Sequence, residues 1–305
     1  MKIQQRKSNV TIATAPCSWG VWYADGGPAG TPWDVFLDEA SQAGYVSLEL
    51  GPDGYLPADA AVLSEELSRR NLAVCAGTAC YRFDRYARFS DFMPQVKTLC
   101  KRLNLFNAPY LVTMDESDVG EYGEKKQTFT TSQWDKYFGM FKEMGHFTKE
   151  EFGIETVFHP HIRSLIETEA EIIRMMDSSG LNLCFDTGHH AYVNSPSTTS
   201  DHSAGDFIKT HADKIAYLHF KNVDETVLAR VRNERLTSRQ AFDMDVMCDL
   251  DAGIIDFREL KQILDDIGYH GIGVIEMDMP KAKPGQAFAA GKRNLEYLRS
   301  IGIIG

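Results

Sequence analysis

Two short apolar segments, each ending in histidine and carboxylate side chains, constrain the fold of this chain more than any other feature. The first covers residues 154–158 and continues into His159-Pro160-His161, and the second covers 182–185 and continues into Asp186-Thr187-Gly188-His189. Between them, residues 167–178 alternate apolar and charged side chains at helical spacing. A strand, a helix and a strand with polar residues at each strand end form the unit of a parallel α/β fold, whose active site lies at the carboxyl ends of the strands.

The same unit repeats along the whole chain. Apolar runs predict eight strands, at 10–15, 45–50, 72–77, 110–114, 154–158, 182–185, 215–220 and 273–277. Helices are predicted at 33–43, 58–70, 92–103, 133–152, 167–178, 206–212, 256–267 and 287–300, and Gly44 ends the first of them. This alternation predicts an α/β chain folded as a (β/α)₈ TIM barrel, with residues 1–305 in a single domain. A doubly wound open sheet is the competing fold, but no Gly-x-Gly-x-x-Gly turn follows the first strand.

Two connections are longer than ordinary loops of a compact domain. Residues 115–131 are acidic and contain glycines, and we expect them to form a long loop over the active face. Residues 222–253 carry several charges and a helical pattern near 225–234, which favours a lid or a partner surface. Both are therefore predicted as loop insertions in the barrel.

Composition excludes several classes of partner. The 32 basic and 43 acidic residues give a net charge of −11 without a long basic run, so a nucleic-acid surface is not expected. No stretch approaches the roughly 18 apolar residues of a membrane span, and no signal-peptide core follows the N-terminus. The six cysteines form no CxxC pair and resemble reduced, buried residues. We expect a cytoplasmic protein.

Ligands of the kind that bind metals stand at the ends of four successive strands. These are His159 and His161 after the fifth strand, Asp186 after the sixth, His219 on the seventh and Glu276 on the eighth. Neighbouring strands of a barrel bring their ends into one volume. Mixed imidazole and carboxylate donors suit a divalent ion such as Mn²⁺, Co²⁺ or Mg²⁺. The joint pattern predicts a metal centre, although each residue alone also has an ordinary structural explanation.

Further side chains are placed to serve this centre. His189 follows Asp186 by three positions, and Lys221 follows His219 by two, so that it shares one strand face with it. Both are candidate acid–base groups, and Lys221 is equally explained by a salt bridge at the rim. Trp19 follows the first strand and Glu49 ends the second, and each either lines a polyol pocket or is a rim residue. His190 is expected at the surface.

At these residues the chain resembles the xylose-isomerase-like barrel superfamily of sugar isomerases, epimerases and dehydratases. Asp186-x-Gly188-His189, His219-Phe220-Lys221 and Val274-Ile275-Glu276 are similar to three of the four segments that hold a divalent metal in that superfamily. The resemblance implies metal ligands at His159, Asp186, His219 and Glu276, where His159 replaces the usual first glutamate. It also implies that His161 is a catalytic histidine, alongside His189 and Lys221.

The closer resemblance is to the myo-inosose-2 dehydratase family of inositol catabolism. It rests on His159-Pro160-His161, on Leu228-Ala-Arg-Val-Arg232 and on Asp251-Ala-Gly253, and it is specific from about residue 155 onward. Arg230 and Arg232 then bind substrate hydroxyls or are charges on a helix surface. The chain departs from that family at Ile162-Arg163-Ser164 and at Cys17-Ser18-Trp19-Gly20. Both departures line the expected pocket and concern the substrate more than the metal.

The expected activity is carbohydrate metabolism by a divalent-metal-dependent hydro-lyase, which dehydrates a keto-polyol of the inosose type through an enediolate. A ketose isomerase or 3-epimerase uses the same enediolate and remains an alternative, as does elimination from a 3-keto-glycoside. A non-catalytic sugar-binding protein is a more distant alternative. Cleavage of abasic DNA, as in the endonuclease branch, is disfavoured by the negative charge. The expected partners are a small keto-polyol or ketose and, since such barrels often pair, further copies of the chain.

Overall fold

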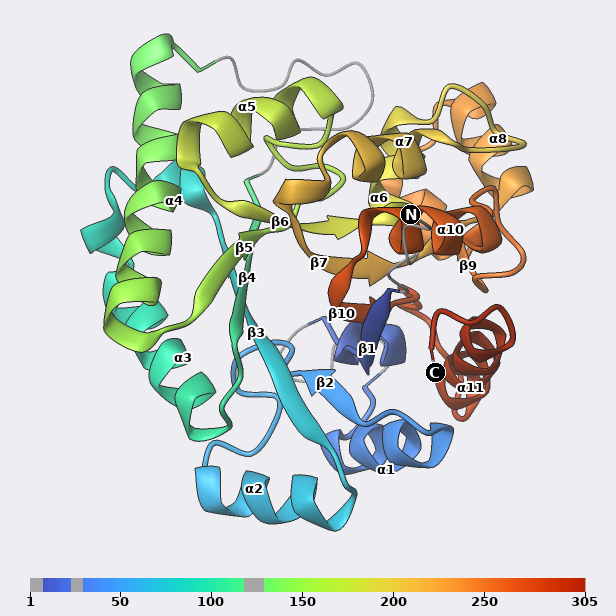
Figure 1. Ribbon diagram of the computed structural model, residues 1–305, viewed down its shortest axis with the longest axis horizontal. Helices are drawn as coiled ribbons and strands as arrows, with labels where there is room; N and C mark the ends of the chain where they lie inside the picture. The colour runs from blue at the N-terminus through green and yellow to red at the C-terminus, as the bar shows by residue number, and fades with distance from the viewer. Residues whose placement is uncertain (1–7, 23–29, 118–128, 305) are drawn as a thin grey trace, which may run out of the picture.

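The computed structural model describes residues 8–22, 30–117 and 129–304, and eight parallel strands among them close into a barrel (Figure 1). The strands are β1 (Asn9–Thr14), β2 (Ser47–Glu49), β3 (Ala73–Tyr81), β4 (Tyr110–Asp115), β5 (Glu155–Phe158), β6 (Asn182–Asp186), β7 (Ile215–Phe220) and β10 (His270–Ile275). Each pairs with its neighbours in chain order, and β1 closes the barrel against β10 through six registered residue pairs. The predicted TIM barrel is confirmed.

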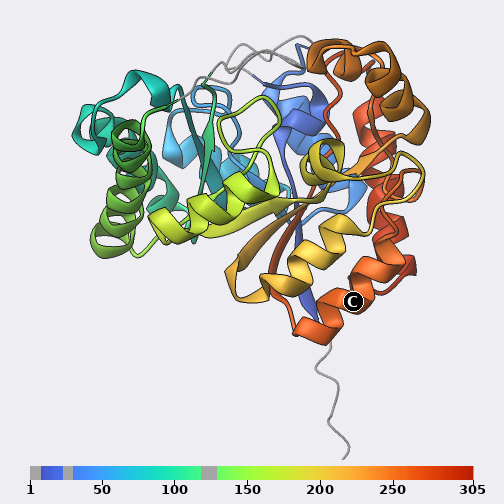
Figure 2. The same ribbon diagram turned by 90° about the horizontal axis from the view of Figure 1, so that it is seen from above.

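Helices cover the outside of the barrel, as Figures 1 and 2 show from two directions. They are α1 (Trp33–Ala43), α2 (Ala60–Arg69), α3 (Met93–Leu105), α4 (Thr131–Phe152), α5 (Glu169–Ser179), α7 (Ser203–Thr210), α10 (Phe257–Ile267) and α11 (Gln286–Ser300). Helix α1 has the predicted bounds because Gly44, at φ 100°, ends it in the left-handed conformation. Along the described ranges, no helix is both long and apolar enough to cross a bilayer.

Two layers of apolar side chains hold these elements together. The barrel interior is filled by a small set that includes Ala13, Val112, Val157, Tyr217 and Val274. A larger cluster fills the space between the strands and the outer helices. All six cysteines are free, and several of them belong to these layers, as their apolar surroundings in the sequence predict. The interior is therefore packed, which leaves the barrel mouth as the place for a ligand.

The long connection after β7 is an ordered excursion. It contains β8 (Asn222–Val223), α8 (Glu225–Glu234), α9 (Ser238–Asp243) and β9 (Met247–Cys248), and the two strands pair antiparallel. The helical piece predicted near 225–234 is confirmed. Of the other predicted insertion, at 115–131, residues 118–128 lie outside the described residues.

One buried amide joins the beginning and the end of this connection. The Asn222 side chain donates to the carbonyls of Leu250 and Ile255, and its oxygen accepts from the amides of Val223 and Ile255 at 2.9–3.0 Å. A Cβ at Gly253 would lie 2.3 Å from Asn222 Cγ, so a glycine is required there. The return of the chain toward α10 depends on this contact.

We predict that Asn222→Ala destabilises the fold. The fully buried amide makes four hydrogen bonds, and each buried polar group left unpaired costs about 1–3 kcal/mol. The urea midpoint of unfolding, followed by circular dichroism, should fall clearly. Asn233→Ala, on the exposed side of α8, is the matched control and should leave the midpoint unchanged. Equal midpoints for both variants would contradict this account of the excursion.

Candidate active site at the barrel mouth

The carboxyl ends of the strands open into a cavity of about 990 Å³. Its floor carries the polar residues at the strand ends, and its wall is formed by apolar and aromatic side chains from several loops. Members of the floor include Glu49, His159, His161, His189, His219, Lys221, Glu276 and Asp278. The cavity lies at the upper end of the roughly 300–1,000 Å³ typical of pockets for small molecules.

The predicted metal ligands stand in one buried cluster. Asp186 ends β6 and is registered with His219 on β7, while Glu276 directly follows β10. His219 Nδ1 lies 3.2 Å from Glu276 Oε2 and 3.7 Å from Asp186 Oδ2. His159 continues the β4–β5 ladder through its amide, and its ring centroid is 4.8 Å from that of His219. Four strands thus place one donor side chain each in the same volume.

The orientation of His219 is set from below by a chain of polar contacts. Its Nε2 lies 3.0 Å from Glu49 Oε1, and the Tyr217 hydroxyl donates to the same oxygen at 2.9 Å. The Tyr217 hydroxyl in turn lies 3.3 Å from Cys75 Sγ inside the barrel. Of the two positions considered for Glu49, the structure shows the one lining the cavity, where its carboxylate contacts His219.

Charge in the cluster shifts the protonation of this histidine. Burial acts to lower the pKa of His219, yet Cys184, Glu276 and Glu49 together raise that pKa well above its usual value. Nearby carboxylates stabilise the charged form of an imidazole.

Lys221 is fully buried and lies between three carboxylates. Its Nζ is 2.8 Å from Asp278 Oδ2, 3.0 Å from Glu276 Oε2 and 3.1 Å from Asp186 Oδ2. Burial disfavours the ammonium, but the carboxylates hold the pKa of Lys221 well above its usual value. Nζ also lies 3.1 Å from His189 Nε2. The residue is a central cation of the site and not a salt bridge at the rim.

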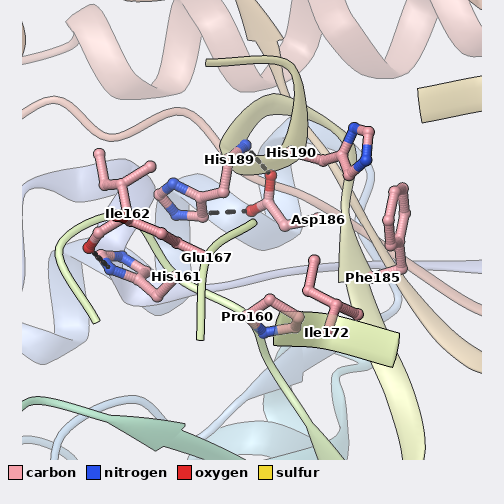
Figure 3. A pocket seen from close by; sticks show the side chains of 9 residues that line it. All are labelled: Pro160, His161, Ile162, Glu167, Ile172, Phe185, Asp186, His189 and His190. Atoms are coloured by element: carbon pink, nitrogen blue, oxygen red, sulfur yellow. Dashed lines mark hydrogen bonds and ion pairs between the residues drawn. The ribbon is translucent and has the colours of Figure 1, made fainter. Parts of the chain in front are cut away.

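His161 and His189 face each other on one side of the cluster, with ring centroids 4.0 Å apart. Both line a small cavity of about 10 Å³. Figure 3 shows them together with Asp186, whose Oδ1 accepts a hydrogen bond from the amide of His189. Burial lowers the pKa of both rings, and the charge of Lys221 contributes to each shift. His161 Nδ1 lies 2.8 Å from the Ile162 carbonyl, so it carries a proton and Nε2 is left as an acceptor. These rings are therefore neutral bases.

His189 lies in the first turn of a helix. Helix α6 (Thr187–Asn194) begins directly after β6 because Asp186 caps it through the His189 amide. The same helix buries His190, whose Nε2 contacts Glu169 at 3.0 Å, so the expectation of a surface position for His190 was wrong. The sequence Asp-Thr-Gly-His is thus both a strand end and a helix start.

Three of the predicted substrate-binding side chains point elsewhere. Trp19 is buried against Phe36 and donates to Glu39 at 2.7 Å. Arg230 is exposed and pairs with Glu234 one helical turn away. Arg232 donates to the Tyr192 and Ser197 carbonyls. None of the three belongs to the cavity wall, so they play no part in the function proposed below.

Asp278 is the site residue that the sequence prediction missed. It is buried, and burial raises its pKa despite the nearby ammonium of Lys221. It follows Glu276 by two positions, which is the spacing that placed Lys221 beside His219. Trp22 and Phe242, edge to face at 5.8 Å, add an aromatic wall that no sequence pattern indicated.

Several atoms of the cluster are suited to a metal ion. Buried His159 Nδ1 and Asp186 Oδ2 make no hydrogen bond within the part of the chain that the structure describes. Donor atoms of Glu49, His219 and Glu276 lie within 4.8 Å of one another, and those of His159, Asp186 and His189 do so as well. Mixed imidazole and carboxylate sets of this kind fit a divalent cation.

The chain is similar to several known proteins. An inosose dehydratase of Bacillus licheniformis is 28% identical over 276 residues, which cover 85% of this chain and 88% of the relative. The solved structure of the IolI protein with a bound zinc atom has a TM-score of 0.71 at 13% identity and covers 97% and 99% of the two chains. A D-allulose 3-epimerase from Methylomonas sp. has a TM-score of 0.65 at 14% identity and covers 96% and 97%.

The two solved structures share the fold alone at such low identity, but a family model gives a closer assignment. The model described as xylose isomerase-like TIM barrel matches residues 37–301, which is nearly all of the chain. The chain therefore belongs to the xylose isomerase-like TIM barrel family.

Proposed function

We propose that the protein is a divalent-metal-dependent lyase that dehydrates a keto-polyol of the inosose type. The observation that carries the proposal is the pair His161 and His189, whose ring centroids are 4.0 Å apart. The pair lies beside a buried cluster of carboxylates at the floor of a large cavity. Neutral imidazoles next to concentrated negative charge are suited to moving protons at a polarised ketone. The inosose dehydratase relative supports this choice of substrate.

His159, Asp186, His219 and Glu276 would hold the ion. In support, each belongs to at least one of the groups of clustered donor atoms, and His159 Nδ1, Asp186 Oδ2 and His219 Nδ1 make no hydrogen bond among the described residues. A bound Mn²⁺, Co²⁺ or Mg²⁺ would act as a Lewis acid toward the substrate ketone. Glu49 would orient His219 from behind, in the way that outer carboxylates fix ligating histidines.

The protein groups then divide the proton transfers. His161 Nε2, left as an acceptor by the Nδ1 contact to Ile162, takes the proton from the carbon next to the ketone. The electrons of the broken C–H bond form a C=C bond as the C–O bond to the β-hydroxyl breaks. The Lys221 ammonium, 3.1 Å from His189 Nε2, supplies the proton that His189 passes to the departing oxygen, which leaves as water. The enol product becomes the second ketone.

The size of the cavity favours a second candidate, elimination from a keto-glycoside. A single-ring polyol needs less than the volume of about 990 Å³, and the wall carries Trp22, Tyr81 and Phe242. Aromatic side chains of this kind pack well against an apolar leaving group. The same base would act, and an alcohol would leave in place of water.

We predict that the purified protein, loaded with Mn²⁺ or Co²⁺, converts inosose to a product with the ultraviolet absorbance of a conjugated dione. A ketose and an aryl 3-keto-glycoside, assayed in parallel by chromatography, distinguish the alternatives. Conversion of the ketose to its epimer without absorbance change would contradict the dehydratase proposal. Turnover of none of these compounds would leave a sugar-binding role.

Asp186→Asn should lower metal retention and turnover together. The substitution keeps an oxygen to cap α6 but removes the charge, and we expect a loss of about 10²–10³-fold in kcat/KM. Elemental analysis and steady-state kinetics measure the two effects. Asp256→Asn, which changes the equivalent cap of α10 outside the site, is the control. An active variant without metal would remove the mechanism.

His161→Asn should separate base catalysis from metal binding. The amide can still donate to the Ile162 carbonyl, whereas the basic Nε2 is lost. We expect kcat to fall by about 10²–10⁴-fold while metal content stays at the wild-type level. Loss of the ion in this variant would instead identify His161 as a ligand.

A further inference from the structure

Lys221 contacts the same atoms that would bind the ion. Its Nζ lies 3.1 Å from Asp186 Oδ2 and 3.0 Å from Glu276 Oε2, and both residues belong to the proposed ligand set. Asp186 Oδ2 also belongs to the atoms that lack a hydrogen bond among the described residues. The Lys221 ammonium and a divalent cation bound to the same two oxygens repel each other. The ammonium at its present position therefore weakens binding of the cation.

The chain is built to seat this lysine. The Thr187 hydroxyl donates to the Lys221 carbonyl at 2.7 Å and accepts from its amide at 3.0 Å. Gly188 lies over the aliphatic stem, where an added Cβ would be 2.6 Å from Lys221 Cγ. His189 then contacts the ammonium. Thr187, Gly188 and His189 thus contact, in that order, the backbone, the aliphatic chain and the ammonium of Lys221.

Asp278 offers the ammonium another place. Its Oδ2 makes the shortest of the three carboxylate contacts, at 2.8 Å, and Asp278 belongs to none of the groups of donor atoms suited to a metal. It projects from the segment after β10, two residues beyond Glu276. A small movement of Nζ away from Asp186 and Glu276 that keeps the contact to Asp278 would release both ligand oxygens while Lys221 retains a charged partner.

We propose that Lys221 is an internal counter-cation of the ligand carboxylates and that Asp278 is the positioning residue that takes over its ammonium when a divalent cation binds. The pair thereby sets the affinity for the ion. The inference rests on the metal centre of the proposed function but not on the reaction catalysed there. It assigns Asp278 a role that requires no contact with substrate.

The experiment measures ion affinity directly. Chelator-treated full-length protein is titrated with Mn²⁺ and with Co²⁺ by calorimetry, for the wild type, Lys221→Met, Asp278→Asn and the double variant. Lys221→Met removes the competitor, so binding should tighten by about 10-fold or more, and Asp278→Asn should weaken it by about 10-fold. In the Lys221→Met background, Asp278→Asn should change the affinity by less than about 3-fold, because Asp278 acts through the lysine.

The double variant separates this role from a simple field effect. If the carboxylate of Asp278 merely attracts the ion, its removal weakens binding equally in both backgrounds, and that result overturns the proposal. Unchanged or weaker binding by Lys221→Met overturns it as well, while the metal centre stands. If neither the wild type nor Lys221→Met binds an ion, both the proposal for Lys221 and the proposed metal centre are wrong.

Gly188→Ala provides a variant that keeps every charge. Crowding of the Lys221 stem should push the ammonium away from Asp186 and tighten Co²⁺ binding, with an altered visible spectrum of the bound ion. Circular dichroism checks that each variant is folded. An affinity and a spectrum identical to those of the wild type would contradict the role of Gly188 in positioning Lys221.

Discussion

Buried negative charge is the constraint on which the barrel mouth depends. The carboxyl groups of Glu49, Asp186, Glu276 and Asp278 lie within one cluster, each less than a tenth exposed. An isolated buried carboxylate costs several kcal/mol, so the cluster is stable only where cations compensate it. Lys221 lies against three of these groups and His219 between two of them, and together they supply part of that compensation. The remaining negative charge is what makes a divalent ion a suitable occupant.

The architecture and the convergence of the strand ends were predictable because both follow from local patterns. Apolar runs of strand length alternate with helical spacing, and closure of the barrel then brings the end of β5 near that of β10 although they are distant in sequence. Spacing by two residues correctly placed Lys221 with His219. The same rule applied after Glu276 would have found Asp278, which a run of methionines and aspartates concealed.

The failures have a common physical origin. Whether Trp19 faces the cavity or Glu39, and whether His190 lies inside or outside, depends on how a short turn leaves its strand. Helix α6 begins without a gap after β6, so its first residues serve the site while His190 turns toward α5. Arg232 likewise donates to one carbonyl within α6 and one in the segment after it, although these residues are 35 and 40 positions away in sequence. Pattern alone does not specify such long-range directions.

The chain of contacts from Cys75 through Tyr217 and Glu49 to His219 couples the inside of the barrel to its mouth. The inner layer of a TIM barrel is usually regarded as filler that tolerates exchange among side chains of similar size. Here Tyr217, a member of that layer, donates its hydroxyl hydrogen to the carboxylate of Glu49, which in turn contacts the proposed ligand His219. Evolutionary drift in the deepest part of the barrel is therefore not neutral for the chemistry above it. Substitutions that repack this interior for stability would at the same time change the environment of the His219 imidazole.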